Sequence, residues 1–299
     1  LKEAFRCSVH HGDASSKDFE EALRQGERCN LLMVGLPCSG NSGANRRRNV
    51  EANLHQSSGD KRLWLGPKVM EVFFRYRPAY IVIEQVGNWQ RTTPCRIILQ
   101  RAKSCGYNCK QYKIQAQRFD LPTYRTRLWT VMSLGSDLVH TYIRALLKVR
   151  RAARPTVLNA WLPSVKRLWV PPRCYSHMAG LIPTTQALPP MTSKWVDKQK
   201  PKFTNYLPRQ TDDGNGTKAD YDQAASLSTE QYLQIQGFPS DWPIAAIGVR
   251  CRSDPICRVS RVTKRALQVG GAQNSSVVQA LVSCITQALK ANHGTPVLA

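Results

Sequence analysis

The sequence predicts an α/β domain with a largely parallel sheet, followed by an irregular basic region. In the first 135 residues, apolar segments typical of buried strands alternate with segments of helical periodicity. From 138 to 196 the composition changes, because this stretch has no Asp or Glu, nine Lys or Arg and seven prolines. We therefore predict an α/β domain over 1–137, a basic region over 138–225 and a segment over 226–299 whose closing helix returns to the first domain.

The predicted elements follow from local patterns. In chain order they are a short helix over 18–23, a buried strand over 31–36, a helix from Pro67 that ends before Pro78, a buried strand over 79–86, a helix that ends at Gly106, strands over 108–114 and 128–134, and a closing helix over 277–290. A proline suits the first turn of the helix at Pro67. Within that helix Val69, Val72, Phe73 and Tyr76 recur at i, i+3, i+4 and i+7, so they share one face.

The remaining segments separate these elements. In the helix before Gly106, Ile97, Ile98 and Ala102 are predicted to face the core. Residues 41–62 are polar and rich in Gly, Ser, Asn and Arg, which predicts a long mobile loop. Between 138 and 196 the prolines exclude long helices from most of the stretch.

Composition limits the class of protein. Lys and Arg number 43 against 20 Asp and Glu, a formal net charge of +23, which favours nucleic acid as partner over an anionic membrane surface. No apolar run approaches about 18 residues, so we expect no membrane span. Ten cysteines occur without a CxxC pair and without an export signal, so we expect no metal site and a reducing intracellular compartment, cytoplasm, nucleoid or nucleus.

Two features lie where an α/β fold places its chemistry, at the carboxyl ends of strands, and a pair of arginines stands before a later strand. Cys38 follows Pro37 after the strand over 31–36, although an isolated cysteine is more often a buried thiol. Glu84 lies near the carboxyl end of the next apolar strand, so Cys38 and Glu84 are predicted to share one pocket. Arg125 and Arg127 stand two apart before a strand, and alternation predicts that both point to the same side.

Together these features resemble the DNA cytosine-5 methyltransferase family, in order along most of the chain. The similar segments are "GLPCSGNSGA" for the Pro-Cys nucleophile loop, "IVIEQV" for Glu-Asn-Val, "TYRTR" for Gln-x-Arg-x-Arg, "LSTEQYLQIQGFP" for the Gln-Gly-Phe-Pro element, and "QVGGAQNSSVVQAL" for the start of the closing helix. Four positions depart from the family pattern: Ser39 and Thr123 replace Gln, while Gln85 and Gly271 replace Asn.

The resemblance implies a Rossmann-like, S-adenosylmethionine-dependent methyltransferase fold with a small irregular target-recognition domain over the basic region. The "HHGDAS" segment is similar to the family's third cofactor element. The glycine-rich turn after the first strand and the acidic residue after the second have no counterpart in residues 1–299. We therefore expect an N-terminally truncated fold that by itself binds S-adenosylmethionine weakly or not at all.

The resemblance also implies the site residues. Cys38 would add to C6 of cytosine, Glu84 would hold N3 and the exocyclic amine, Arg127 would hold O2, and Arg125 would orient the thiolate loop. The residues expected to bind the cofactor are Asp13, Pro37, Leu63, Gly271 and Ser275. The residues expected to bind DNA are Ser42, Arg46, Arg47, Arg48, Lys166 and Arg167.

Three functions remain open on the sequence. The first is a monomeric DNA cytosine-5 methyltransferase that flips its target base out of double-stranded DNA, as restriction-modification enzymes do. The second is methylation of cytosine in RNA. The third is a nucleic-acid-binding homologue that has lost catalysis. The missing cofactor motif and the departures at Gln85, Thr123 and Gly271 favour it, and the intact Cys38, Glu84, Arg125 and Arg127 oppose it.

Overall fold

The computed structural model describes residues 13–14, 16–26, 29–36, 64–161, 167–170, 180–183, 231, 234–239 and 274–293, with backbone only for 159, 167–170, 180–183 and 293. Contacts divide the chain into two units. The first comprises Leu1–Ile114, Thr126–Val149 and Leu281–Ala299, and the second comprises Gln115–Arg125 and Arg150–Ala280. The division predicted from the sequence, at 137 and 225, stays a prediction.

The first unit is built on a four-stranded sheet in the order β1-β2-β4-β3. Its strands are β1 (Leu31–Gly35), β2 (Tyr80–Gln85), β3 (Tyr107–Gln115) and β4 (Thr126–Leu134). β1 and β2 are parallel, but β2 and β4 are antiparallel, so the expectation of a largely parallel sheet was wrong. Only residues 116–125 join β3 to β4, which is too short for the crossover that parallel strands need.

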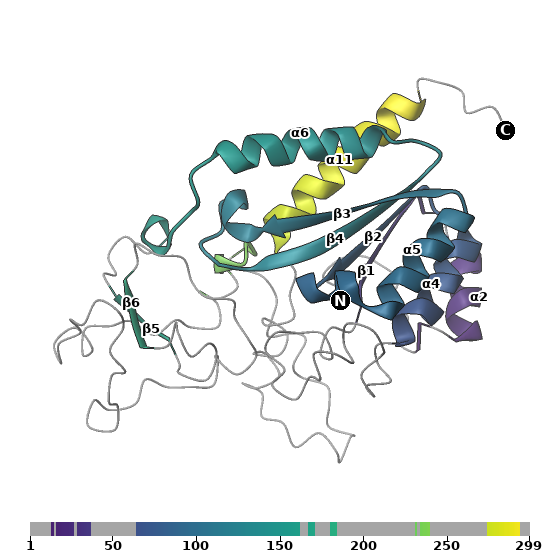
Figure 1. The fold of residues 1–299 in the computed structure, drawn as a ribbon, viewed down its shortest axis with the longest axis horizontal. Helices are drawn as coiled ribbons and strands as arrows, with labels where there is room; N and C mark the ends of the chain where they lie inside the picture. The colour runs from purple at the N-terminus through teal and green to yellow at the C-terminus, as the bar shows by residue number, and fades with distance from the viewer. Residues whose placement is uncertain are drawn as a thin grey trace, which may run out of the picture. The chain divides into compact units, whose positions relative to one another are not determined.

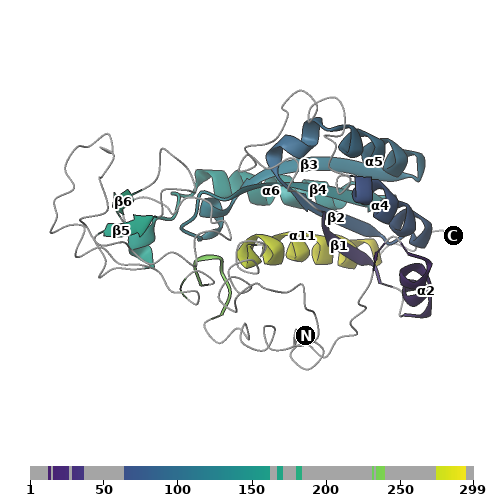
Figure 2. The same ribbon diagram turned by 90° about the horizontal axis from the view of Figure 1, so that it is seen from below.

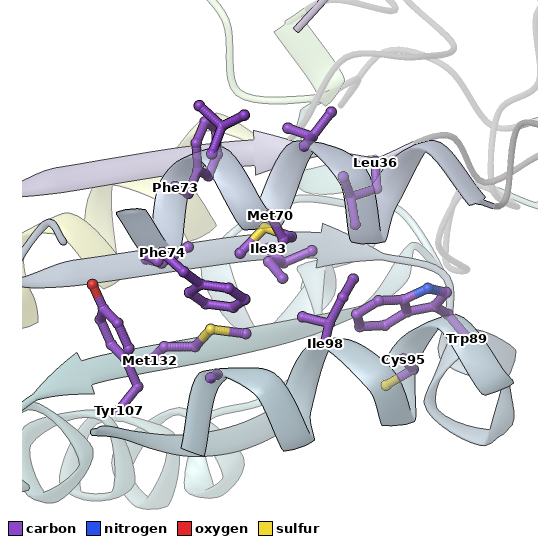
Figure 3. Packing of buried hydrophobic residues seen from close by; sticks show 14 of the residues in the cluster. Leu36, Met70, Phe73, Phe74, Ile83, Trp89, Cys95, Ile98, Tyr107 and Met132 are labelled. Carbon is purple, nitrogen blue, oxygen red and sulfur yellow. The ribbon is translucent and has the colours of Figure 1, made fainter. Parts of the chain in front are cut away.

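Helices cover both faces of this sheet (Figures 1 and 2). The helices of the first unit are α2 (Lys17–Gln25), α4 (Leu65–Tyr76), α5 (Thr93–Ser104), α6 (Leu138–Ala152, up to Val149) and α11 (Ser275–His293, from Leu281). On one side α4 and α5 bury Met70, Phe74 and Ile98 against the sheet residues Ile83 and Met132 (Figure 3). On the other side α6 and α11 are tied to the strands by side-chain hydrogen bonds, from His140 and Asn292 respectively.

Helix ends show why these segments fold as they do. Ser16 caps α2, because its hydroxyl accepts a hydrogen bond from the backbone N–H of Phe19 at 3.2 Å. Thr92 does the same for α5 with Cys95 at 3.4 Å, and Pro94 occupies the first turn. α4 ends at Tyr76, and its C-cap residue Arg77 lies in the left-handed region directly before Pro78, so the helix ends before Pro78 as predicted.

The elements agree with the sequence predictions except in three places. Ile97 does not face the core, since it is 39% exposed while Ile98 and Ala102 are buried. β1 is half-buried rather than buried, because it stands at one end of the described sheet. The start of the basic region forms a long helix, α6, which the prolines of this region do not interrupt because it ends before Pro155. One face of α6 buries Val139, His140 and Ile143. The loop predicted over 41–62 lies outside the described residues.

The second unit contains two short antiparallel strands and a turn. β5 (Arg167–Val170) pairs with β6 (Gly180–Pro183) inside the predicted basic region. The turn at Gln236-Gly237-Phe238-Pro239 packs against the start of α11, where the hydroxyl of Ser275 donates to the carbonyl of Gly237. Gly237 has a φ of +87°, and a Cβ there would lie 2.5 Å from Ser275 Oγ, so glycine is required for two reasons.

We predict that Gly237→Ala destabilises the protein through both effects. The left-handed backbone costs an alanine about 1–2 kcal/mol, and crowding against Ser275 adds about 1–3 kcal/mol. Two variants separate the contributions in urea unfolding: Gly135→Ala has a φ of +81° but open space, and Gly87→Ala has open space and no positive φ. If Gly237→Ala lowers the free energy of unfolding no more than Gly135→Ala does, crowding against Ser275 makes no contribution.

A second prediction concerns His140, which is fully buried in α6. Its Nδ1 lies 3.0 Å from the Tyr112 hydroxyl, and its Nε2 lies 3.4 Å from both Ser133 Oγ and the Asn108 carbonyl. Burial lowers the pKa of this imidazole from its ordinary 6.5, so the folded state excludes a proton that the unfolded chain accepts. We therefore expect stability to be fully present above about pH 6.5 and to fall as the pH drops below it.

The comparison of wild type with His140→Gln tests this. The urea midpoint of each protein should be measured at about pH 8 and at about pH 5.5. The drop in midpoint between these two pH values should be larger in wild type than in the variant, because the variant has no imidazole to protonate. Equal falls in both proteins would show that other groups cause the acid sensitivity.

Candidate active site

The carboxyl ends of β1 and β2 lie side by side, because the two strands are parallel. Their register pairs Gly35, the last residue of β1, with Glu84. Gly35 has no side chain, so on the β1 side no bulky group adjoins Glu84 in this row. The chain leaves β1 through Leu36 directly into Pro37 and Cys38. The pocket predicted for Cys38 and Glu84 would lie at this end of the two strands, and it stays a prediction because Pro37 and Cys38 lie outside the described residues.

Glu84 and Arg127 form an ion pair across β2 and β4. Arg127 Nε lies 2.9 Å from Glu84 Oε1, and the two side chains are only 20% and 14% exposed. The register explains the contact: Glu84 stands opposite Trp129, and Arg127 is two residues from Trp129 on the same face of β4. This diagonal position is within reach of long side chains. The structure thus brings together two of the residues predicted to touch the base.

The surroundings hold this pair in place. Arg127 Nη1 also donates to the carbonyl of Thr126 at 2.9 Å, so its guanidinium has two anchors. Trp129, directly opposite Glu84, is 2% exposed and cannot move without disturbing the core. Because the pair is mostly buried, removing either partner would leave the other charge poorly solvated. The arrangement presents a carboxylate and a guanidinium together at the edge of the sheet.

Gln85 points to the opposite face of β2 from Glu84 and is 1% exposed. Its Nε2 donates to the carbonyl of Leu36 at 2.9 Å, and its Oε1 accepts from the backbone N–H of Val86 at 2.9 Å. The sequence marked Gln85 only as a departure from the family pattern. Alternation along the strand, which turns residue 85 away from Glu84 and toward the core, was the signal that could have assigned it a contact.

Arg125 is described separately, because it falls in the second unit. It is 4% exposed, and its carbonyl accepts from the backbone N–H of Ala116 at 3.0 Å. β4 begins at Thr126, so the alternation used to predict a common side for Arg125 and Arg127 does not apply. Its predicted role toward the thiolate loop stays a prediction.

Two of the predicted cofactor residues are described. Asp13 is exposed, and its carbonyl accepts from Ser16 N at 2.9 Å in the turn that precedes α2. An exposed carboxylate at the start of a helix suits the expected contact with an adenine amino group. Ser275 is half-buried, with its hydroxyl bonded to Gly237, so it supports the turn of the second unit.

The other predicted site residues lie outside the described part of the chain. These are Pro37, Cys38, Ser42, Arg46, Arg47, Arg48, Leu63, Lys166 and Gly271, while Arg167 is described by its backbone in β5. Their assignments stay predictions.

The cysteines of the described part narrow the choice of nucleophile. Cys29, Cys95, Cys105, Cys109 and Cys284 are free thiols. Burial raises the pKa of Cys95 and Cys109 to about 11 and also raises the pKa of Cys284, so these three are protonated at neutral pH. Among the residues that the structure describes, no three His, Cys, Asp or Glu side chains cluster as metal ligands do.

Positive charge collects on α6. This helix carries no acidic residue, and the exposed Arg144, Lys148 and Arg151 are spaced i, i+4 and i+7, which places them in one stripe. A cavity of about 290 Å³ lies elsewhere, between α2 and α4, and its Arg24 and Arg75 are both paired with Glu20. Within the described part of the chain, no helix is long and apolar enough to span a membrane.

Several solved structures with similar folds are methyltransferases. The Dnmt2 methyltransferase of S. pombe has a TM-score of 0.58 at 15% identity, covering 94% of this chain and 84% of its own. The Entamoeba histolytica methyltransferase EhMeth has a TM-score of 0.60 at 13% identity, covering 96% and 86%. A DNMT2 mutant of Spodoptera frugiperda has a TM-score of 0.52 at 11% identity, covering 95% and 87%. These likenesses show the fold, a Rossmann-like methyltransferase fold.

The sequence itself matches a family model. A comparison with curated proteins gave no match. The model for C-5 cytosine-specific DNA methylases matches residues 1–157, which is more than half of the chain. Members of that family are S-adenosylmethionine-dependent methyltransferases of cytosine. The chain therefore belongs to the C-5 cytosine-specific DNA methylase family.

Proposed function

We propose that this protein methylates C5 of a flipped-out cytosine in DNA through a covalent bond between Cys38 and C6. The observation that carries the proposal is the Glu84–Arg127 ion pair beside the end of β1. Cys38 follows Gly35 by three residues, which span at most about 11 Å, and Gly35 is the register partner of Glu84. Connectivity therefore keeps the thiol within reach of a base held by the pair.

Each residue has a task set by the chemistry of cytosine. C5 is a poor nucleophile until a thiolate adds to C6 and turns the ring into an enamine. Cys38 supplies this thiolate, and loss of the C5 proton after methylation expels it. Glu84 accepts a hydrogen bond from the exocyclic amine and shares a proton at N3, which stabilises the adduct. Arg127 holds O2, while Arg125 orients the thiolate loop.

The ion pair is compatible with both assigned contacts. A guanidinium has five N–H donors, and Nε and Nη1 of Arg127 are occupied by Glu84 and Thr126. Nη2 is therefore available for O2 of the base without breaking the pair. The carboxylate has a second oxygen, Oε2, for the base. Holding both groups before the base arrives avoids reorganisation during the reaction.

S-adenosylmethionine would supply the methyl group when bound. Asp13 would hold the adenine, and Pro37, Leu63, Gly271 and Ser275 are the other residues assigned to the cofactor. The exposed carboxylate of Asp13 supports this assignment.

DNA is proposed as the substrate because the family is one of DNA methylases and the chain is strongly basic. Flipping a base costs a few kcal/mol, which pocket and phosphate contacts offset. Ser42, Arg46, Arg47 and Arg48 would contact the phosphates near the base. Lys166 and Arg167 belong to the region over 138–225, which would read the sequence.

The covalent step can be tested with a cytosine that carries fluorine at C5. Fluorine cannot leave as a proton, so methylation should trap the Cys38 adduct as a complex that resists denaturation. The full-length protein should trap fluorocytosine duplex DNA only with S-adenosylmethionine present. Cys38→Ser should abolish trapping, and Glu84→Gln should slow it about 10²-fold or more through loss of the N3 partner.

Two controls separate the alternatives. Cys38→Ser should bind DNA nearly as wild type does, because phosphate contacts come from other residues. If the protein traps fluorocytosine RNA but not fluorocytosine DNA, the substrate is RNA and the proposal of DNA is wrong. Binding without trapping of either would show a binder that has lost catalysis.

The basic stripe of α6 gives a further prediction. Each cation that meets a phosphate adds about 0.9 to the slope of log affinity against log salt. Arg144→Gln with Lys148→Gln should therefore flatten the slope by about 2 and weaken binding to every sequence alike. The matched control is Arg96→Gln with Lys103→Gln, which removes the same charge from exposed positions on α5. Equal slopes for the two double variants would show that the stripe only faces solvent.

A further inference from the structure

We propose that Gln85 is a positioning residue that fixes the backbone of Leu36 and thereby the point where the chain enters Pro37–Cys38. This inference rests on the proposed role of Cys38 as nucleophile. It assigns a task to the position where the chain has Gln in place of the Asn of the family pattern.

The hydrogen bond joins two strand ends. The amide of Gln85 spans from β2 to the carbonyl of Leu36, at 2.9 Å, one residue beyond the end of β1. The strand ladder itself pairs residues only as far as Gly35 and Glu84. Gln85 therefore extends the connection between the strands by one residue toward Cys38.

The amide is itself held in one orientation. Its oxygen accepts from the backbone N–H of Val86 at 2.9 Å, which leaves the nitrogen to face Leu36. The residue is 1% exposed, so water does not compete for these bonds. A buried carbonyl at Leu36 without this donor would lose a partner that solvent could not readily replace.

Leu36 is fixed through its side chain as well. It is 7% exposed and belongs to the core cluster (Figure 3). A Cβ on Gly66 would lie 3.1 Å from its Cδ1 and 3.6 Å from Cδ1 of Ile98, so helices α4 and α5 pack closely here. With carbonyl and side chain both held, Leu36 is a fixed origin for the segment that carries the thiol.

Peptide geometry links this origin to Cys38. Pro37 and Cys38 lie outside the described residues, but two residues span at most about 7 Å. Proline also restricts its own φ. The position of Leu36 therefore limits where Cys38 can lie relative to Glu84, the neighbour of Gln85. A misplacement of about 1 Å can cost a reaction about 10²-fold.

The test uses the isosteric variant Gln85→Met in the full-length protein, with Thr130→Val as matched control. Thr130 is also a buried polar residue of the sheet, and its hydroxyl accepts from Gln111 at 3.1 Å, away from Leu36. Both variants lose buried hydrogen bonding, two bonds at Gln85 and one at Thr130. Only Gln85→Met should lower the rate constant for trapping fluorocytosine DNA, by about 10- to 100-fold, with DNA affinity unchanged.

Hydrogen exchange in the free protein supplies a readout independent of activity. Amides in the peptide that covers 31–38 should exchange at least about 10-fold faster in Gln85→Met than in Thr130→Val, because local opening there becomes easier. Trapping within about 3-fold of wild type, or equal exchange in both variants, would overturn the inference. Absence of trapping in wild type would instead reject the proposed function, and exchange would still decide whether Gln85 anchors Leu36.

Discussion

Strand β2 determines the geometry of the candidate site, because it pairs with β1 and β4 at the same time. Its two registers place Gly35, Glu84 and Trp129 in one row across the sheet. Two residues before Trp129 in β4, Arg127 reaches across to Glu84. Backbone ladders thus set the carboxylate, the guanidinium and the exit of β1 relative to one another. Any slip of register by one residue would turn Glu84 to the opposite face.

Glu84 and Gln85 show how one strand end serves two purposes. Neighbouring residues of a strand point to opposite faces, so Glu84 meets Arg127 while Gln85 meets Leu36. In the proposed function the first contact would shape the pocket for a base, and the second would anchor the chain that leads to Cys38. The Gln at position 85 is one methylene longer than the family's Asn. This length suits the contact, because the amide must reach the carbonyl of Leu36 beyond the end of β1.

The sequence predicted the elements well and the sheet less well. Helical periodicity and prolines located α4 and α5, and apolar continuity located β2, because these signals are local. Strand direction depends on pairing between distant segments, and there the expectation of parallel strands failed at β4. The resemblance indicated Glu84 and Arg127 as partners of one base. Their ion pair, and the bond from Gln85 to Leu36, depend on register and could not be derived from spacing alone.

The placement of charge at this edge has a physical cost that favours a functional role. Burying a carboxylate and a guanidinium requires desolvation, which their attraction offsets only with good geometry. An apolar pair at these positions would hold β2 to β4 as well, since the strands are already joined by their ladder. The ion pair therefore adds little to the stability of the sheet, and its charges are better explained by the binding of a polar ligand. A site borne on strands is more rigid than one borne on loops. For the proposed nucleophile, which follows the end of β1, precision would therefore depend on the anchor at Leu36.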